Sequence, residues 1–206
     1  MSPTIIFLNG TSSSGKTTLA KELQEQLDQP YLHLALDQFR DSLPDKFRGL
    51  NSPREAPGAR GLNVVPSVNT DSYTTSIVFG DTGKLMLKGM RKAMAAMATV
   101  GNNIIVDDII LETNFLNEYL RIFQKLEVYF VGVRCPIEVV SERESNRLGR
   151  FPGTAASHLV ICHEHDVYDI EVNTAVHSPK ECASLILKRM QIPPTAFAEL
   201  RRLRLY

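Results

Sequence analysis

One short motif near the N-terminus constrains the fold of this chain more than any other feature. Residues 10–17 (GTSSSGKT) match the pattern G-x-x-x-x-G-K-[ST] at every fixed position. The motif follows a short apolar run at 4–8 and leads into a helical pattern from Lys16 to about Leu27. A buried strand, a tight loop and a helix in this order are the structural context in which this motif binds nucleotide phosphates.

The residue types of this loop suit a polyphosphate ligand. Glycines let backbone N–H groups approach phosphate oxygens closely, and the helix N-terminus adds the positive end of its dipole. Lys16 would bring a cation to the β- and γ-phosphates, and the Thr17 hydroxyl can bind Mg²⁺. We expect the Lys16 side chain to face solvent before a nucleotide binds. The alternative is a Gly/Ser turn that only caps a helix. The predicted nucleotide-binding residues of the loop are Gly10, Thr11, Ser12, Ser13, Ser14, Gly15, Lys16, Thr17 and Thr18.

Further apolar runs predict the rest of the architecture. Besides 4–8, strands are expected at 31–36, 103–106, 127–134 and 169–172. Helical patterns cover 80–99 and the residues from Pro136 towards Arg147. Buried strands that alternate with helices are typical of a parallel sheet covered on both faces. The sequence therefore predicts an α/β fold of the P-loop type: a doubly wound, mainly parallel five-stranded sheet with helices on both faces.

The length of 206 residues fits one domain, so we expect a single domain over 1–206. Residues 43–75 interrupt the strand–helix rhythm because they are rich in proline, glycine and polar side chains. A segment of that kind either covers the substrate that accepts the phosphoryl group or is a plain surface excursion; the first is preferred. The tail 193–206 carries arginines among leucines and predicts an amphipathic C-terminal helix rather than an RNA or membrane contact.

Two acidic residues follow the strand expected at 103–106. Asp107 and Asp108 directly succeed a buried run, which is the usual place for the carboxylate that assists magnesium in phosphoryl transfer. Because neighbouring residues of a strand point to opposite faces, one carboxylate can serve the metal while the other orients a neighbour. The alternation alone does not decide between them, although Asp107 is preferred. The alternative is a pair of aspartates that caps the next turn.

Asp37 stands where the second predicted strand ends. Ligands of open α/β sheets bind at the edge formed by the carboxyl ends of the strands. A carboxylate at that edge could accept the proton of an attacking hydroxyl group as a general base. Alternatively, Asp37 caps a helix that begins at Gln38.

Three arginines lie at offsets of four and three: Arg143, Arg147 and Arg150. On a helix, Arg143 and Arg147 would share a face, and Arg150 would lie just beyond Gly149. Arginine suits transition-state charge because its planar fork holds phosphate oxygens in pairs and keeps its charge. The pattern indicates a hinged lid over 143–155. A solvated helix face with Glu–Arg pairs is the alternative.

Charge and composition exclude several other classes. Lys plus Arg equals Asp plus Glu at 23 each, so no overall field favours nucleic acid or an anionic membrane. No apolar run reaches the ~18 residues of a membrane span, and the N-terminus lacks a signal-peptide pattern, so we expect a cytoplasmic protein. The three cysteines lie far apart and predict neither a disulfide framework nor a zinc site. A cluster of His158, His163, His165 and Asp166 matches no zinc motif and is interpreted as structural.

Taken together, these stretches resemble the chloramphenicol phosphotransferase family. The matching blocks are 5–10 (IIFLNG), Gly15-Lys16, Leu36-Asp37, 104–108 (IIVDD), 131–135 (VGVRC), 142–150 (ERESNRLGR), His163 and 168–174 (YDIEVNT). They are more specific than a phosphate loop alone and span most of residues 5–174. Gly149 departs from the pattern, which has an acidic residue there, and 43–75 aligns with no block.

The resemblance implies ATP and Mg²⁺ as cofactors and an antibiotic-type O-phosphotransfer to a small molecule that carries a hydroxyl group. It implies that Asp37 is the base, that the three arginines close over the phosphates, and that Thr174 lies near the adenine. Chloramphenicol itself does not follow, because 43–75 would shape the acceptor site. The competing interpretations are a nucleoside- or shikimate-type metabolic kinase and a nucleotide-binding regulator without transfer activity. A homo-oligomer is left open.

Overall fold

The centre of the protein is a five-stranded parallel sheet, seen here in a computed structural model that describes residues 3–69, 72–147 and 151–204. The strand order is β2-β6-β1-β7-β8, and every neighbouring pair is parallel. The predicted fold class is therefore confirmed. The strands are β1 (Thr4–Asn9), β2 (Tyr31–Ala35), β6 (Asn103–Asp108), β7 (Glu127–Arg134) and β8 (Ile170–Asn173).

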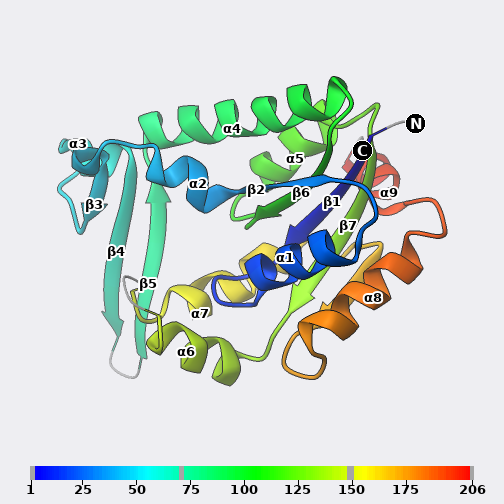
Figure 1. Ribbon diagram of the computed structural model, residues 1–206. Coiled ribbons are helices and arrows are strands. Elements are labelled where there is room, and N and C mark those ends of the chain that lie inside the picture. The colour runs from blue at the N-terminus through cyan, green and yellow to red at the C-terminus, as the bar shows by residue number, and fades with distance from the viewer. Residues whose placement is uncertain (1–2, 70–71, 148–150, 205–206) are drawn as a thin grey trace.

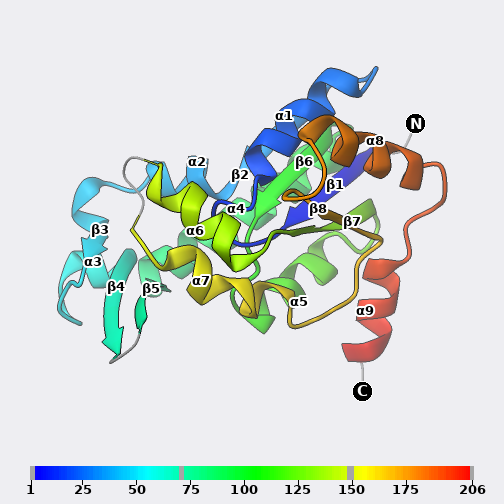
Figure 2. The same ribbon diagram turned by 90° about the horizontal axis from the view of Figure 1, so that it is seen from below.

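Helices cover both faces of this sheet (Figures 1 and 2). One face carries α1 (Lys16–Gln26) and α8 (Pro179–Arg189); the other carries α4 (Asp81–Thr99), α5 (Thr113–Ile122) and α9 (Ala196–Arg204). Alternation along the strands explains the two layers. In β1, Ile6 and Leu8 are buried in a cluster with Leu19 of α1, whereas Ile5 and Phe7 belong to the cluster beneath α4, α5 and α9.

The stretch 43–75 contains regular structure that the sequence analysis did not predict. It holds η1 (Asp45–Phe47), β3 (Arg48–Leu50), α3 (Pro57–Arg60), β4 (Leu62–Asn69) and the start of β5 (Ser72–Phe79). Strands β3 and β4 are parallel and β4 and β5 antiparallel, and together they form a second sheet to one side of the first (Figure 1).

The second sheet was not predicted from the sequence because a proline such as Pro66 inside an apolar run argues against a central strand. Strand β3 pairs with β4 only from Leu62 to Val64, so Pro66 lies where β4 is an edge strand. There the missing N–H group of proline costs no ladder hydrogen bond to β3.

Thr75 of β5 connects the second sheet to the chain before α7 (Thr154–Leu159), which follows α6 (Ile137–Ser145). The backbone N–H of Thr75 donates to the carbonyl of Gly153 over 3.3 Å, and its hydroxyl donates to the carbonyl of Pro152 over 2.6 Å. Its own carbonyl accepts from Ser157 Oγ at 2.7 Å. Strand β5 and α7 therefore lie side by side, as both views show.

Among the residues that the structure describes, no helix is both long and apolar enough to cross a membrane. Cys135, Cys162 and Cys182 are buried and free of disulfides, in keeping with their scattered spacing in the sequence.

Candidate active site

The phosphate loop lies between the end of β1 and the start of α1, and two of its residues need glycine. A Cβ atom at Gly10 would lie 2.5 Å from the carbonyl oxygen of Val133 on β7, so a side chain there would clash with the backbone. Gly15 has a φ of 95° and Ser13 a φ of 60°, both in the left-handed region. A left-handed residue within a turn directs successive N–H groups into one concavity, which is suited to an anion.

Lys16 is buried, with 7% of its surface exposed, so the expectation of a solvent-facing side chain is wrong. Its amine donates to the carbonyl oxygens of Gly10 and Thr11, both at 2.9 Å. The loop turns these carbonyls inward, and a flexible ammonium group folds back to satisfy them. The cation therefore already lies within the concavity of the loop.

Ser13 and Ser14 carry hydroxyl groups that are buried without a hydrogen-bond partner among the described residues. Buried polar atoms of that kind are rare in folded proteins and call for an explanation. Ser13 lines the cavity in front of the loop, where its hydroxyl is suited to donate to a phosphate oxygen, whereas Ser14 is fully buried behind it.

A cavity of about 610 Å³ opens in front of the loop. It brings together eleven of the predicted site residues from five parts of the chain: Ser12, Ser13, Gly15, Lys16, Thr17, Thr18, Asp37, Asp107, Arg143, Arg147 and Thr174. Gly10, Thr11, Ser14 and Asp108 do not line it, and Arg150 lies outside the described residues. Thr11 instead donates from its hydroxyl to the carbonyl of Ala155 in α7, at 2.6 Å.

Asp107 faces this cavity from the end of β6. Its Oδ2 accepts a hydrogen bond from Thr17 Oγ1 at 2.7 Å and contacts His33 Nε2 at 3.3 Å, and its Oδ1 lies 3.9 Å from Lys16 Nζ. Burial alone would raise the pKa of Asp107, but the His33 contact, the Lys16 charge and the Thr17 hydroxyl together hold that pKa below its ordinary value. The carboxylate is therefore ionised at neutral pH.

Asp108 points to the opposite face, towards α5. Its Oδ2 accepts from the Tyr119 hydroxyl at 2.6 Å, and its Oδ1 accepts from the N–H of Ile109 at 2.7 Å. Burial raises its pKa to about 6, against the lowering effect of these two hydrogen bonds and of the Arg91 charge. The expectation that Asp108 serves the metal therefore needs correction, because the alternation of β6 turns its side chain away from the loop.

The raised pKa of Asp108 makes the stability of the protein depend on pH. The folded state binds this proton more tightly than the unfolded state, so the stabilisation is complete below the unfolded pKa of about 4 and is lost as pH rises through about 6. Ionisation of Asp108 therefore lowers the free energy of unfolding by about 3 kcal/mol between pH 4 and pH 7. In Asp108→Asn this loss should be absent, because an amide has no proton to release.

Urea unfolding of both proteins between pH 4 and pH 7.5 measures the effect. The stability of Asp108→Asn relative to the original protein should rise with pH, and the exposed Asp28→Asn should show no such trend. Parallel profiles for Asp108→Asn and the original protein would contradict the assignment.

Asp37 lies in the first turn of α2 (Leu36–Asp41), just past the end of β2. The alternative that it caps a helix beginning at Gln38 is wrong, since the helix begins before it. Its Oδ1 accepts from Arg40 Nη1 at 2.7 Å, and 43% of its side chain is exposed. The carboxylate is therefore held by a cation yet open to a ligand in the cavity.

Arg143 of α6 reaches the loop after β8. It donates to the hydroxyl of Thr174 at 3.0 Å and to the carbonyl of Thr174 at 2.8 Å. The Thr174 hydroxyl in turn donates to the carbonyl of Ser14 at 2.7 Å. Arg147 lies two residues beyond the end of α6 and lines the cavity. Arg143 thus joins α6 to the phosphate loop through one threonine.

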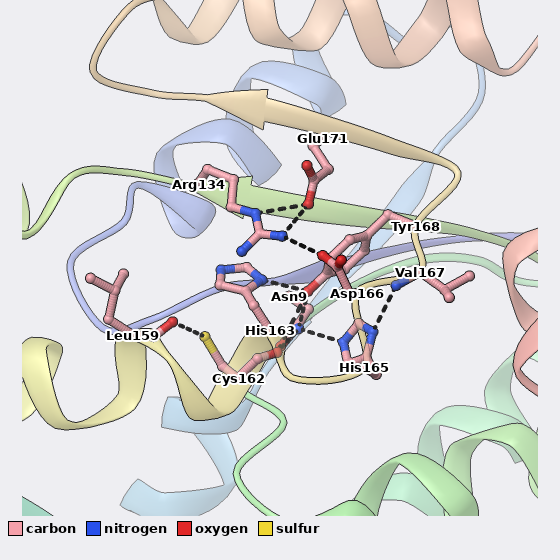
Figure 3. A network of polar contacts seen from close by, with 10 residues as sticks. All are labelled: Asn9, Arg134, Leu159, Cys162, His163, His165, Asp166, Val167, Tyr168 and Glu171. Atoms are coloured by element: carbon pink, nitrogen blue, oxygen red, sulfur yellow. Dashed lines mark hydrogen bonds and ion pairs between the residues drawn. The ribbon is translucent and has the colours of Figure 1, made fainter. Parts of the chain in front are cut away.

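Asn9, the last residue of β1, holds a polar network beside the loop (Figure 3). Its amide donates to the carbonyl of Cys162 at 2.6 Å and to the Tyr168 hydroxyl at 2.7 Å, and its Oδ1 accepts from the N–H of Ile110. Because Tyr168 accepts from Asn9, its own hydrogen is directed to His163 Nδ1. Burial lowers the pKa of His163 to about 3, so the ring stays neutral and can accept it.

Two residues of the histidine-rich stretch make packing and ion-pair contacts. His165 stacks on Phe130 with ring centroids 5.0 Å apart, and Asp166 pairs with Arg134. Within 3–69, 72–147 and 151–204, no group of three or more His, Cys, Asp or Glu residues is placed to hold a metal ion.

Sequence reasoning missed His33, Arg40 and the wider role of Asn9. His33 sits in a strand between two leucines, where a histidine suggests only a half-buried position. The sequence position that could have identified His33 as a site residue is its place four residues before Asp37, on a strand predicted to end near the phosphate loop.

A parallel sheet with a phosphate loop at the end of its central strand and an ionised aspartate on the adjacent strand is the fold of P-loop proteins, which solved kinase structures share. The family match and the relative described next make this P-loop protein a small-molecule kinase, an enzyme that transfers phosphoryl groups to small molecules. The chain belongs to the chloramphenicol phosphotransferase-like protein family, whose sequence profile matches residues 3–191. The resemblance inferred from the sequence blocks is thereby confirmed.

Individual relatives agree with this placement. A Mycobacterium tuberculosis protein (strains CDC 1551 / Oshkosh and ATCC 25618 / H37Rv), named Putative O-phosphotransferase, is 30% identical in an alignment of 210 positions, gaps included, that covers 96% of this chain and 88% of the relative. Three solved structures share the fold. A sugar kinase from Janibacter sp. HTCC2649 has a TM-score of 0.61 and 20% identity, with 95% of this chain and 98% of that chain covered. The Mycobacterium tuberculosis APS kinase CysC has a TM-score of 0.61 and 13% identity, with coverages of 92% and 98%, and the Deinococcus radiodurans tunicamycin resistance protein has a TM-score of 0.59 and 19% identity, with coverages of 93% and 97%.

Proposed function

We propose that this protein transfers the γ-phosphoryl group of ATP to a hydroxyl group of a small molecule. The observation that supports this proposal most directly is the single cavity that gathers Lys16, Thr17 and Asp107 with Asp37. The first three suit a nucleotide with its metal ion, and the fourth suits an acceptor hydroxyl. A protein that only binds nucleotides has no use for a carboxylate at the fourth position.

The nucleotide would lie along the phosphate loop. Backbone N–H groups and the hydroxyl of Ser13 bind the phosphate oxygens, and Lys16 exchanges its loop carbonyls for the β- and γ-phosphates. Arg143 and Arg147 add charge from α6 and the residues after it. Arg150 and the lid over 143–155 remain part of the proposal, as does a position of the adenine near Thr174.

Thr17 and Asp107 would hold Mg²⁺. A hydroxyl and an ionised carboxylate 2.7 Å apart are oxygen ligands of the kind that this ion prefers. When bound, the ion neutralises negative charge that develops between the β- and γ-phosphates.

Transfer to the acceptor involves Asp37. The acceptor oxygen forms a bond to the γ-phosphorus, the bond from that phosphorus to the β–γ bridging oxygen breaks, and ADP leaves with the electron pair. The acceptor proton passes to the Asp37 carboxylate, which Arg40 keeps in place. The exposed fraction of Asp37 leaves room for the acceptor to approach.

The second sheet is the proposed acceptor-side structure. Its strands lie between Arg48 and Phe79 and so include much of 43–75, the segment in which no block of the family pattern could be recognised from the sequence. We infer that this segment selects the acceptor, which is a hydroxylated antibiotic of the chloramphenicol type or a metabolite with a comparable hydroxyl group.

Calorimetry with ATP and GTP, each with and without Mg²⁺, tests the nucleotide part of the proposal. We expect binding that is tighter with the metal ion, and no binding of either nucleotide would end the proposal. A screen with ATP and hydroxylated acceptors, including chloramphenicol, nucleosides and shikimate, then identifies the acceptor class by ³¹P NMR of the product. Metal-dependent ATP binding without transfer to any acceptor would favour the regulator.

A further inference from the structure

His33 is placed to act on Asp107 from the neighbouring strand. Strands β2 and β6 are paired so that Ala35 lies opposite Asp107 and His33 opposite Ile105. Alternate residues share a face, so His33 and Asp107 both point to the α1 side of the sheet, where the phosphate loop lies. The side chain of His33 is 14% exposed and that of Asp107 is 7% exposed, so their contact is shielded from water.

Two donors meet at one oxygen of the Asp107 carboxylate. Oδ2 contacts His33 Nε2 at 3.3 Å and Thr17 Oγ1 at 2.7 Å, whereas Oδ1 is the atom nearest to Lys16. An ionised carboxylate only accepts hydrogen bonds, so the facing nitrogen of His33 carries the hydrogen. Donors from a strand and a helix fix both the rotation and the tilt of the carboxylate.

We propose that His33 is a positioning residue for Asp107, which orients the carboxylate towards Thr17 for metal–nucleotide binding. His33 touches neither nucleotide nor acceptor in this assignment, and it acts only through Asp107. The same strand leads directly into the turn that carries Asp37, so β2 supports both carboxylates of the proposed reaction. The inference rests on the proposed function, since it presumes that Asp107 serves a metal ion.

Three substitutions of His33 distinguish the loss of its hydrogen bond to Asp107 from a change in side-chain volume. His33→Leu fills the space without a donor. His33→Gln carries an amide nitrogen at about the distance of Nε2, whereas the amide of His33→Asn ends near the position of Nδ1 and falls short of Asp107. The exposed His177→Leu serves as the matched control.

The first measurement is the affinity of Mn²⁺ for the protein–ADP complex, obtained from the concentration of free Mn²⁺ by electron paramagnetic resonance. The second is the affinity of the protein for ADP in EDTA, which removes the metal ion. We expect His33→Leu and His33→Asn to weaken Mn²⁺ binding by about tenfold or more, the usual effect of removing a hydrogen-bond partner of a metal ligand. His33→Gln should stay within about threefold of the original protein, and ADP affinity in EDTA should be unchanged in all variants.

The outcomes are distinct. Unchanged Mn²⁺ affinity in His33→Leu and His33→Asn would overturn the inference and leave the proposed function intact. A matching loss in His33→Gln would also overturn it, because the donor would then be irrelevant. If the original protein bound ADP no better with Mn²⁺ than in EDTA, the proposed function would fail and the inference with it. Should His33→Leu not fold, the Asn and Gln pair still decides.

Discussion

Replacing Lys16 by alanine is expected to lower kcat for phosphoryl transfer by about 10³-fold, because the transition-state charge on the phosphates loses its buried cation. The Lys16 amine lies within the loop, where low solvent exposure strengthens its interaction with phosphate oxygens. Substrate saturation should not restore the rate, since the lost interaction belongs to the transition state. The measurement is steady-state turnover with the acceptor identified by the screen.

The same substitution also leaves the carbonyls of Gly10 and Thr11 without their donor. We therefore expect a loss of about 1–2 kcal/mol of unfolding free energy, which is small enough to leave the protein folded. Lys21→Ala, an exposed change one turn further along α1, is the matched control and should keep both rate and stability. Full activity in Lys16→Ala would end the kinase assignment of this loop.

Asp37→Asn should reduce kcat by about 10²- to 10⁴-fold, the usual contribution of a general base, while the KM for ATP changes little. An amide keeps the size of the side chain and can still contact Arg40, but it cannot take up the proton of the acceptor. Arg40 also pairs with Asp41, so α2 retains an ion pair in the variant. Turnover at saturating ATP over a range of acceptor concentrations gives the two parameters.

Asp41→Asn is the matched control for this experiment. It removes the other carboxylate that pairs with Arg40 and carries the same change of charge on the same helix. If the two variants lost activity equally, the effect would come from Arg40 or from net charge rather than from a base at Asp37. Unaltered turnover in Asp37→Asn would mean that another group, or water, accepts the proton.

The three central strands β1, β6 and β7 could be predicted because each contains an uninterrupted apolar run, whereas the outer strands β2 and β8 are interrupted by His33 and Glu171. A fully buried strand shows that pattern in the sequence without any knowledge of its neighbours. The second sheet could not be predicted, because Pro66 is compatible with a strand only where the neighbouring strand has already ended. That condition depends on the register between β3 and β4, which lie more than ten residues apart in the chain.

The candidate site shows the same limit at the level of single side chains. The motif predicted a tight loop between a buried strand and a helix, but not that Lys16 would donate hydrogen bonds to the carbonyls of its own loop. Similarly, alternation predicted that Asp107 and Asp108 would diverge, while the choice between them required the position of α1 relative to α5. Tertiary contacts of this kind are absent from any local pattern.

The hydrogen bonds of Thr75 bear on any attempt to graft an acceptor segment from one relative onto another. Thr75 fastens β5 to α7, and α7 in turn holds Thr11 through the carbonyl of Ala155. A transplant of 43–75 that brings an apolar residue to this junction would lose the hydrogen bond from the Thr75 hydroxyl to the carbonyl of Pro152, worth about 1 kcal/mol, and would keep the two bonds made by the backbone of that position. Because α7 also binds Thr11 of the phosphate loop, a chimera that keeps a hydroxyl side chain at position 75 should preserve the support of that loop better than one that carries an apolar residue there.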